Sequence, residues 1–260
     1  MHGSLALLLN AAGLAARWVR RQEGIVLLVA LAIGLTLFGF IKIAEEVTEG
    51  DTPDFDIWLL RLLRQPDHPE IPIGPSWLLD SARDITTLGG RTVLVMVVVA
   101  ALGYLILEHK LGAMWFVLLA AAGGGGLSTT MKYYFLRDRP DVVPRLAVVT
   151  SPSFPSGHSV FAAVIYLTLG VLVARFTERR RTRIYLVFLA LALTFLVGIS
   201  RVYLGVHYPT DVLAGWCVGL AWALACWLMA RYLQYRGSIE RAIPIEPSAA
   251  APPSELGRRS

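Results

Sequence analysis

The sequence predicts an all-α integral membrane protein, a bundle of six transmembrane helices. Of its 260 residues, 55% are hydrophobic and only 17% are charged, which is less charge than a soluble domain of this size usually carries. The apolar residues gather in uncharged runs, each about long enough to cross a hydrocarbon core of about 30 Å. These runs lack the polar face that helices of a soluble bundle show. They cover residues 24–41, 92–107, 111–131, 159–174, 184–200 and 212–230.

The first run follows a basic N-terminal segment, residues 1–23, and residues 24–235 are expected to form the membrane domain. An acidic segment, residues 44–90, separates the first two runs and holds ten acidic residues against three arginines. Within it, DFDIWLLRLLRQ predicts an amphipathic helix lying on the membrane surface. The apolar face of this helix would carry Trp58, Leu59, Leu62 and Leu63.

Two acids of this segment, Asp54 and Asp56, could suggest a metal site. No further ligand set follows them in the sequence, so we expect both to be plain solvated acids. In the third run, four consecutive glycines occupy residues 123–126. They predict close packing of a neighbouring helix, with a local loosening of the helix as the alternative.

Arginines set the orientation, because basic residues favour the cytoplasmic side. They cluster before the first run, in the link RFTERRRTR after the fourth run, and in the C-terminal part of the chain. With a cytoplasmic N-terminus, six crossings place all three clusters in the cytoplasm, and the acidic segment faces outward. Residues 236–260, rich in Pro, Ala, Ser and charge, are expected to be a disordered cytoplasmic tail.

Cations on the outer side depart from this pattern. They lie between the third and fourth runs and at the outer end of the fifth, and their position predicts that they bind an anion. Contact with lipid headgroups, or pairing with the acidic segment, is the alternative, but neither explains the neighbouring histidines. The cations are Lys132, Arg137, Arg139, Arg145 and Arg201.

Three polar stretches, KYYFLRDRP, PSGH and SRVYLGVHYPTD, fall on this same outer face when the crossings are counted. Arginine can bind a phosphate through two N–H groups and lysine as a point charge, which suits Lys132, Arg139 and Arg201. Ser156 and Gly157 stand where the fourth helix begins, and its free backbone N–H groups favour an anion. The sequence therefore predicts an extracytoplasmic active site that binds phosphate.

Two histidines complete the predicted site. Because imidazole titrates near neutral pH, His207 can attack phosphorus while His158 donates a proton to the departing oxygen. Asp211, four residues after His207, can accept a hydrogen bond from its ring and fix the tautomer.

The three stretches resemble the signature motifs of the type 2 phosphatidic acid phosphatase (PAP2) superfamily. These motifs are Lys, six residues, Arg-Pro; then Pro-Ser-Gly-His; then Ser-Arg, five residues, His, three residues, Asp, and all match without a gap. The resemblance implies a bacterial membrane lipid phosphatase with a six-helix core, a phosphohistidine intermediate and no metal or other cofactor. It implies His207 as nucleophile, Asp211 as its partner and His158 as acid. The phosphate ligands it implies are Lys132, Arg139, Ser156, Gly157 and Arg201, with Arg137 fitting a longer form of the first motif.

A site at the outer lip of the inner membrane suits a phosphorylated lipid as substrate and the bilayer as its surroundings. Candidates are undecaprenyl pyrophosphate, phosphatidic acid, phosphatidylglycerophosphate, diacylglycerol pyrophosphate and a lipid A phosphate. A lipid phosphotransferase using the same phosphohistidine is one alternative. A membrane haem protein with His158 and His207 as axial ligands is another. Nothing points to nucleic acid, and the oligomeric state stays open.

Overall fold

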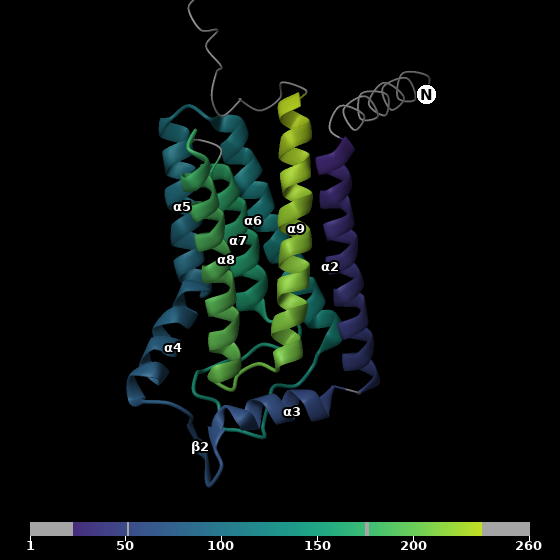
Figure 1. Ribbon diagram of the computed structural model, residues 1–260, viewed down its shortest axis with the longest axis vertical. Helices are drawn as coiled ribbons and strands as arrows, with labels where there is room; N and C mark the ends of the chain where they lie inside the picture. Colours follow the sequence, from purple (N-terminus) through teal and green to yellow (C-terminus); the bar gives the residue numbers. More distant parts are fainter. Residues whose placement is uncertain (1–22, 51, 175–176, 236–260) are drawn as a thin grey trace, which may run out of the picture.

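The computed structural model describes residues 23–50, 52–174 and 177–235 (Figure 1). The predictions for the N-terminal segment and the tail fall on residues 1–22 and 236–260, outside this part of the chain. Long helices run side by side along the bundle, and shorter elements gather at one of its ends. The long helices are α2 (Glu23–Glu49), α5 (Arg91–Leu107), α6 (Leu111–Phe135), α7 (Gly157–Ala174), α8 (Arg180–Tyr203) and α9 (Pro209–Tyr235). The short elements are α3 (Pro53–Leu62), β1 (Arg64–Gln65), β2 (His68–Pro72) and α4 (Ser76–Leu88).

The predicted multi-span helical fold is confirmed. Within the described residues, five helices are long and apolar enough to cross a membrane, namely α2, α6, α7, α8 and α9. A sixth span is possible if α4 and α5, which are bent by 47° at their junction, count as one. The sequence predicted no helix for the α4 segment, which is part of the acidic segment 44–90. The structure shows a helix there, and its Ala82 and Thr86 are buried.

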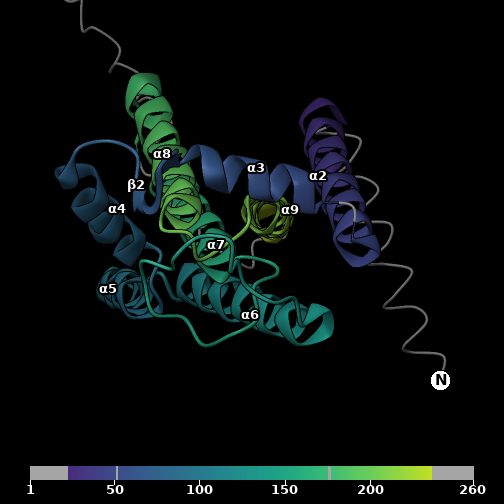
Figure 2. The ribbon, with the colours of Figure 1, turned by 90° about the horizontal axis from the view of Figure 1, so that it is seen from below.

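Helix α7 lies at the centre of the bundle, between α6, α8 and α9 (Figure 2). Small residues let its neighbours approach closely. A Cβ atom at Gly219 of α9 would lie 2.5 Å from Ala163 of α7, and one at Gly124 of α6 would lie 2.9 Å from Val164. The predicted close packing at residues 123–126 is therefore confirmed at Gly124, and it also holds at Gly123, where a Cβ would meet Trp222.

Helix α3 lies across the end of the bundle, close to the start of α9 (Figures 1 and 2). It is amphipathic as predicted, and Trp58 and Leu62 are exposed on its outer face. Leu59 and Leu63, expected on the same face, are half-buried. The opposite face buries Leu60 completely against the α8–α9 region, which fixes α3 onto the bundle.

Candidate active site

The three polar stretches come together at the end of the bundle where α6 ends and α9 begins (Figure 1). The loop after α6 crosses to the α8–α9 turn, where Arg139 Nη1 donates to the carbonyl oxygen of Val206 at 2.6 Å. The loop before α7 reaches α9, where the Ser156 N–H donates to the carbonyl oxygen of Asp211 at 2.9 Å. These contacts join segments that lie more than 50 residues apart in the sequence.

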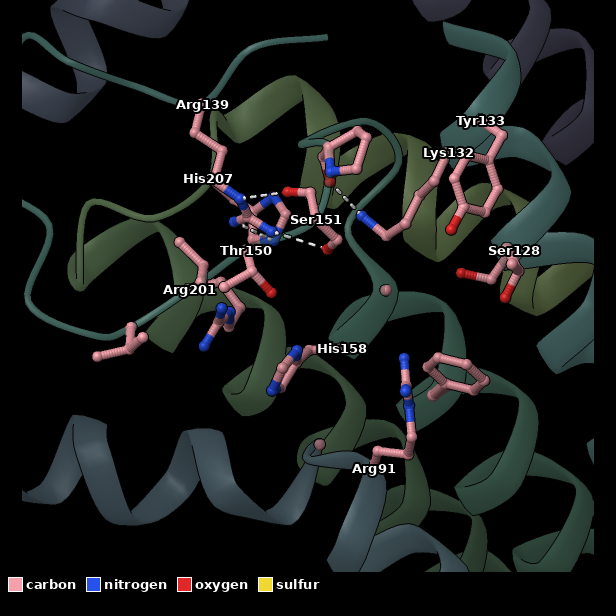
Figure 3. A pocket seen from close by; sticks show the side chains of 17 residues that line it. Arg91, Ser128, Lys132, Tyr133, Arg139, Thr150, Ser151, His158, Arg201 and His207 are labelled. Carbon is pink, nitrogen blue, oxygen red and sulfur yellow. Dashed lines mark hydrogen bonds between the residues drawn. The ribbon is translucent and has the colours of Figure 1, made fainter. Parts of the chain in front are cut away.

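A cavity of about 520 Å³ opens between these segments (Figure 3). Its polar lining comes from α5, α6, α7, α8 and the two loops at this end. Six of the nine residues that the sequence assigned to the site line it, namely Lys132, Arg139, Gly157, His158, Arg201 and His207. The other three, Arg137, Ser156 and Asp211, lie behind this lining.

His207 is delivered to the cavity by a tight turn between α8 and α9. Gly205 in this turn has φ +68°, and a Cβ there would lie 2.7 Å from Arg64 Nη2, so both backbone and space call for glycine. Pro209 then begins α9, and its fixed φ suits a first helical position. The turn holds the His207 ring in place with only 1% of the residue exposed.

The two nitrogens of the His207 ring have different partners. Nδ1 lies 3.2 Å from Asp211 Oδ2, so it carries the proton and donates to the carboxylate. Nε2 is left with its lone pair and lies 3.1 Å from Arg139 Nη1, which donates to it. This tautomer presents Nε2 to the guanidinium that would hold a phosphate.

The protonation of His207 follows from its surroundings. Burial lowers its pKa to about 3, although Asp211 beside it favours the charged ring. His207 is therefore neutral at neutral pH, as a nucleophile must be. Burial also lowers the pKa of Arg139, to about 10, which leaves this guanidinium charged. The pair thus consists of a neutral ring and a cation that share one face of the cavity.

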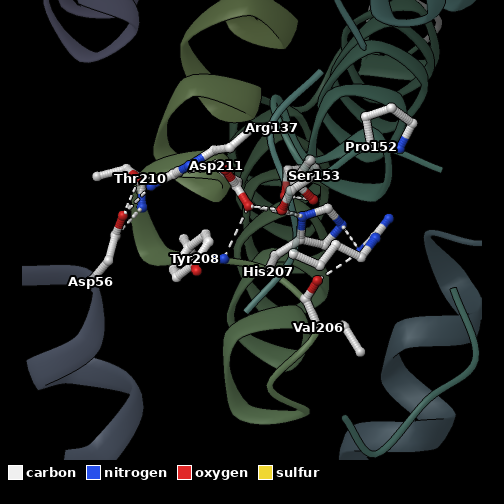
Figure 4. A network of polar contacts seen from close by, with 12 residues as sticks. Asp56, Arg137, Pro152, Ser153, Val206, His207, Tyr208, Thr210 and Asp211 are labelled. Carbon is white, nitrogen blue, oxygen red and sulfur yellow. Dashed lines mark hydrogen bonds and ion pairs between the residues drawn. The ribbon is translucent and has the colours of Figure 1, made fainter. Parts of the chain in front are cut away.

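Asp211 is completely buried and fully engaged (Figure 4). Oδ2 accepts hydrogen bonds from the His207 ring, the Ser153 hydroxyl and, at 3.0 Å, the Tyr208 N–H. Oδ1 accepts one from Arg137 Nη1 at 2.7 Å. A buried carboxylate needs such donors to stay ionised, and together they fix its orientation toward His207.

Arg137, which the family resemblance implied as a phosphate ligand, is not among the residues that line the cavity. Its guanidinium bridges two buried carboxylates, with Nη1 on Asp211 and Nη2 2.8 Å from Asp56 Oδ2. Thr52 and Thr210 accept its other hydrogen bonds, at 3.0 and 2.9 Å. Pairing with the acidic segment, the alternative for the outer cations, therefore holds for Arg137.

Asp56 is 0% exposed, so the prediction of a solvated acid was wrong for this residue. Besides Arg137, it accepts hydrogen bonds from the N–H and the hydroxyl of Thr210, at 3.0 and 2.6 Å (Figure 4). Asp56 thus holds the first turn of α9 and the guanidinium that touches Asp211. Its spacing of four residues from Leu60, which is also fully buried, was the available signal, because both lie on one face of α3.

Ser156, the other predicted ligand at the start of α7, is also absent from the cavity lining. It is completely buried. Its N–H donates to the carbonyl oxygen of Asp211, and its hydroxyl accepts a hydrogen bond from the Ser159 hydroxyl at 3.0 Å. Gly157 does line the cavity, and a Cβ there would lie 3.3 Å from Lys132 Cε. The absence of a side chain at this position therefore keeps the start of α7 open to a ligand.

The remaining cations are held by short contacts. Lys132 Nζ donates to the carbonyl oxygen of Pro152 at 2.6 Å, which holds the loop before α7. Arg201 is buried, and its Nη1 donates to Thr86 Oγ1 of α4 at 3.0 Å, a partner that the sequence did not suggest. Arg201 Nε is buried and has no partner among the described residues.

The described part of the chain contains no cluster of three or more His, Cys, Asp or Glu side chains that could hold a metal ion. Several cationic side chains line the cavity, and such groups stabilise a phosphoryl group. The arrangement combines a neutral imidazole, a second histidine and the three predicted cations Lys132, Arg139 and Arg201 around one space.

Comparison with known proteins places this geometry in a family. Residues 113–235 match the family model of the PAP2 superfamily. Phosphatidylglycerophosphatase B of Bacillus subtilis (strain 168) is 35% identical over 162 residues, covering 61% of this chain and 73% of that protein. Undecaprenyl-diphosphatase of Sulfolobus acidocaldarius is 36% identical over 70 residues, 27% of this chain and 30% of that protein.

Two solved structures share the fold of this chain. The crystal structure of a transmembrane PAP2 type phosphatidylglycerolphosphate phosphatase from Bacillus subtilis superimposes with a TM-score of 0.68 at 28% identity, covering 76% of this chain and 96% of that one. Aquifex aeolicus LpxE shares the fold, with a TM-score of 0.51 at 23% identity over 67% of this chain and 95% of the other. The chain therefore belongs to the PAP2 superfamily, as a multi-pass membrane protein of its bacterial lipid phosphatase branch.

Proposed function

We propose that this protein removes phosphate from a membrane lipid headgroup, using His207 as a nucleophile that becomes phosphorylated. One observation carries the proposal: His207 Nε2, with its lone pair free of a proton, faces the Arg139 guanidinium at 3.1 Å on the wall of a cavity lined by further cations. A phosphate held by those cations would place its phosphorus next to Nε2.

The first step transfers the phosphoryl group to the protein. His207 Nε2 forms a bond to phosphorus, the bond from phosphorus to the leaving oxygen breaks, and His158 gives that oxygen its proton. The ring gains positive charge, which Asp211 stabilises through Nδ1. Lys132, Arg139 and Arg201 balance the charge on the phosphoryl oxygens, which is the main work in such transfers.

The second step returns the protein to its starting state. Water attacks phosphorus, the phosphorus–nitrogen bond breaks, and His158, now neutral, takes the proton of the water. Inorganic phosphate leaves, and His207 is neutral again with its proton on Nδ1. A phosphotransferase would differ only here, because a lipid hydroxyl would replace water.

The orientation follows from charge. Arg180 and Arg183 stand at the start of α8, and the cavity lies where α8 ends, so the two are at opposite ends of the bundle. By the preference of basic residues for the cytoplasm, the cavity faces outward from the cytoplasmic membrane. A lipid headgroup of the outer leaflet lies at this level, and α3 with its exposed Trp58 suits the same interface.

Phosphatidylglycerophosphate is the first substrate to test, since a relative that aligns with 61% of this chain is named for it. The experiment measures phosphate release from the lipid candidates by the full-length protein in detergent micelles, with no added lipid acceptor. We expect turnover of at least one lipid, and unchanged turnover in EDTA. Release only with an added acceptor would favour the phosphotransferase, and inhibition by EDTA that a divalent ion reverses would contradict the metal-free reaction.

The pKa of His207 gives a second test. Because burial lowers the pKa to about 3, the ring loses its proton well below neutral pH and stays neutral as pH rises further. We expect nitrogen NMR of histidine-labelled protein to show His207 as the Nδ1–H tautomer throughout the range from about pH 5 to pH 8. A His207→Gln sample assigns the signal. A titration midpoint within that range would contradict the neutral nucleophile.

A further inference from the structure

One cation of the cavity has no part in the proposed reaction. Arg91, the first residue of α5, lines the cavity, and Figure 3 shows its side chain reaching into it. Within the described part of the chain, Arg91 has no hydrogen-bond or ion-pair partner. An exposed arginine alone is ordinary, but this one faces a cavity that is already rich in positive charge, where its charge has no counterpart.

A second group in the cavity also lacks a partner. Ser128, on α6 one turn before Lys132, lines the cavity and is only 1% exposed. Its hydroxyl has no hydrogen-bond partner among the described residues. Leaving a buried hydroxyl unpaired is unfavourable, so it points to a ligand that completes the site.

Both groups lie where the leaving group would be. In Figure 3, Arg91 and Ser128 stand on the side of the cavity away from His207 and Arg139. Arg91 enters beside the proton donor, since a Cβ at Gly89, two residues earlier, would lie 3.3 Å from the His158 side chain. Attack by His207 in line with the breaking bond sends the leaving oxygen past phosphorus, toward His158 and this side of the cavity.

The volume of the cavity allows for more than the transferred phosphoryl group. At about 520 Å³, it falls within the range of about 300–1,000 Å³ that is typical of sites enclosing a whole small molecule. The proposed phosphoryl ligands, Lys132, Arg139 and Arg201, already provide three cations for one phosphate. A fourth cation matches a substrate that brings a second negative group.

We propose that Arg91 and Ser128 form a second anion subsite, which binds a phosphate group within the leaving group of the substrate. This inference rests on the proposed function. The leaving group of phosphatidic acid is neutral diacylglycerol. The leaving group of phosphatidylglycerophosphate is phosphatidylglycerol, which carries a phosphodiester, and that of a lipid diphosphate is a lipid monophosphate. The bonds formed and broken are the same in all three cases. The subsite therefore selects lipids whose leaving group carries a phosphate of its own.

The first test compares kcat/KM of the full-length protein for phosphatidylglycerophosphate, undecaprenyl diphosphate and phosphatidic acid. We expect Arg91→Gln to lower kcat/KM for the first two by about tenfold or more relative to phosphatidic acid, because one charge-assisted contact is lost. Arg91→Lys should restore part of this preference, and Ser128→Ala should shift it in the same direction as Arg91→Gln.

Arg83→Gln is the matched control. Arg83 lies on α4, is exposed, contacts Asp80 at 3.4 Å and stands outside the cavity lining. The same loss of charge there should leave the ratio of kcat/KM values unchanged. Equal losses on all three lipids in Arg91→Gln, or an unchanged ratio, would overturn the subsite.

The second test separates the subsite from the reaction by measuring binding without turnover. Calorimetry with methylenediphosphonate and with inorganic phosphate reports whether a second phosphate gains affinity from Arg91. We expect Arg91→Gln to weaken diphosphonate binding by about tenfold and phosphate binding much less. If no lipid is hydrolysed but this difference is found, the proposed function fails and the subsite stands. If lipids are hydrolysed and diphosphonate binds Arg91→Gln as well as wild type, the subsite fails alone.

Discussion

His207→Ala should reduce phosphate release by about 10⁴-fold or more, because it removes the proposed nucleophile that forms the covalent intermediate. The side chain is almost fully buried, so the variant leaves a space beside Asp211 that water can fill. Quenching the wild type during turnover of a ³²P-labelled lipid should trap acid-labile label on the protein. The same treatment of His207→Ala should trap none.

His68→Ala is the control for this variant. His68 is exposed on β2, near the same end of the bundle, and its ring contacts Glu70 rather than the cavity. Its removal should leave turnover and labelling intact. Circular dichroism and gel filtration in detergent would verify that both variants remain folded. Turnover above about one hundredth of wild type in His207→Ala, or label trapped in it, would show that another atom attacks phosphorus.

Asp56→Ala should both destabilise the protein and lower kcat, although Asp56 does not line the cavity. Removing one partner of a buried ion pair costs about 3–5 kcal/mol, and here it leaves the Arg137 guanidinium with a single carboxylate. Arg137 is then drawn toward Asp211, and the first turn of α9 loses its anchor at Thr210. We expect kcat to fall by about tenfold or more with little change in KM, since Asp56 acts through Asp211 rather than on the substrate.

The neighbouring Asp54→Ala provides the control, because Asp54 lies on the same helix and is exposed. It should match the wild type in both stability and kcat. Combining Asp56→Ala with Arg137→Met should cost less than the sum of the two changes, as for any pair in direct contact. Strict additivity, or a loss confined to KM, would exclude the proposed positioning role of Asp56.

The sequence was informative wherever a pattern is local. Apolar runs located the long helices, although α2 continues to Glu49 and α8 begins at Arg180, because charged residues at a helix end can reach the interface. The motif spacing predicted that Lys132, His158 and His207 share a cavity, and they do. In each case a periodic run or a fixed spacing carries the information.

What the sequence missed depends on contacts between distant segments. Asp56 lies 81 residues from Arg137 and 154 from Thr210, and no local pattern reports such a pairing. The sequence assigned Arg137 to the phosphate because it fits a longer form of the first motif, and no local pattern reports its pairing with Asp56. Thr86 accepts a hydrogen bond from Arg201, which lies 115 residues later in the sequence, and it belongs to a segment for which the sequence predicted no helix.

The placement of α3 and α4 has a consequence for any attempt to shorten this protein. A fragment limited to residues 113–235 would retain every motif residue and the whole region that matches the family model. It would nevertheless lack the Asp56 carboxylate and the Thr86 hydroxyl, which accept hydrogen bonds from Arg137 and Arg201 respectively. A shortened enzyme therefore has to keep α3 and α4 as well, although neither helix carries a motif residue.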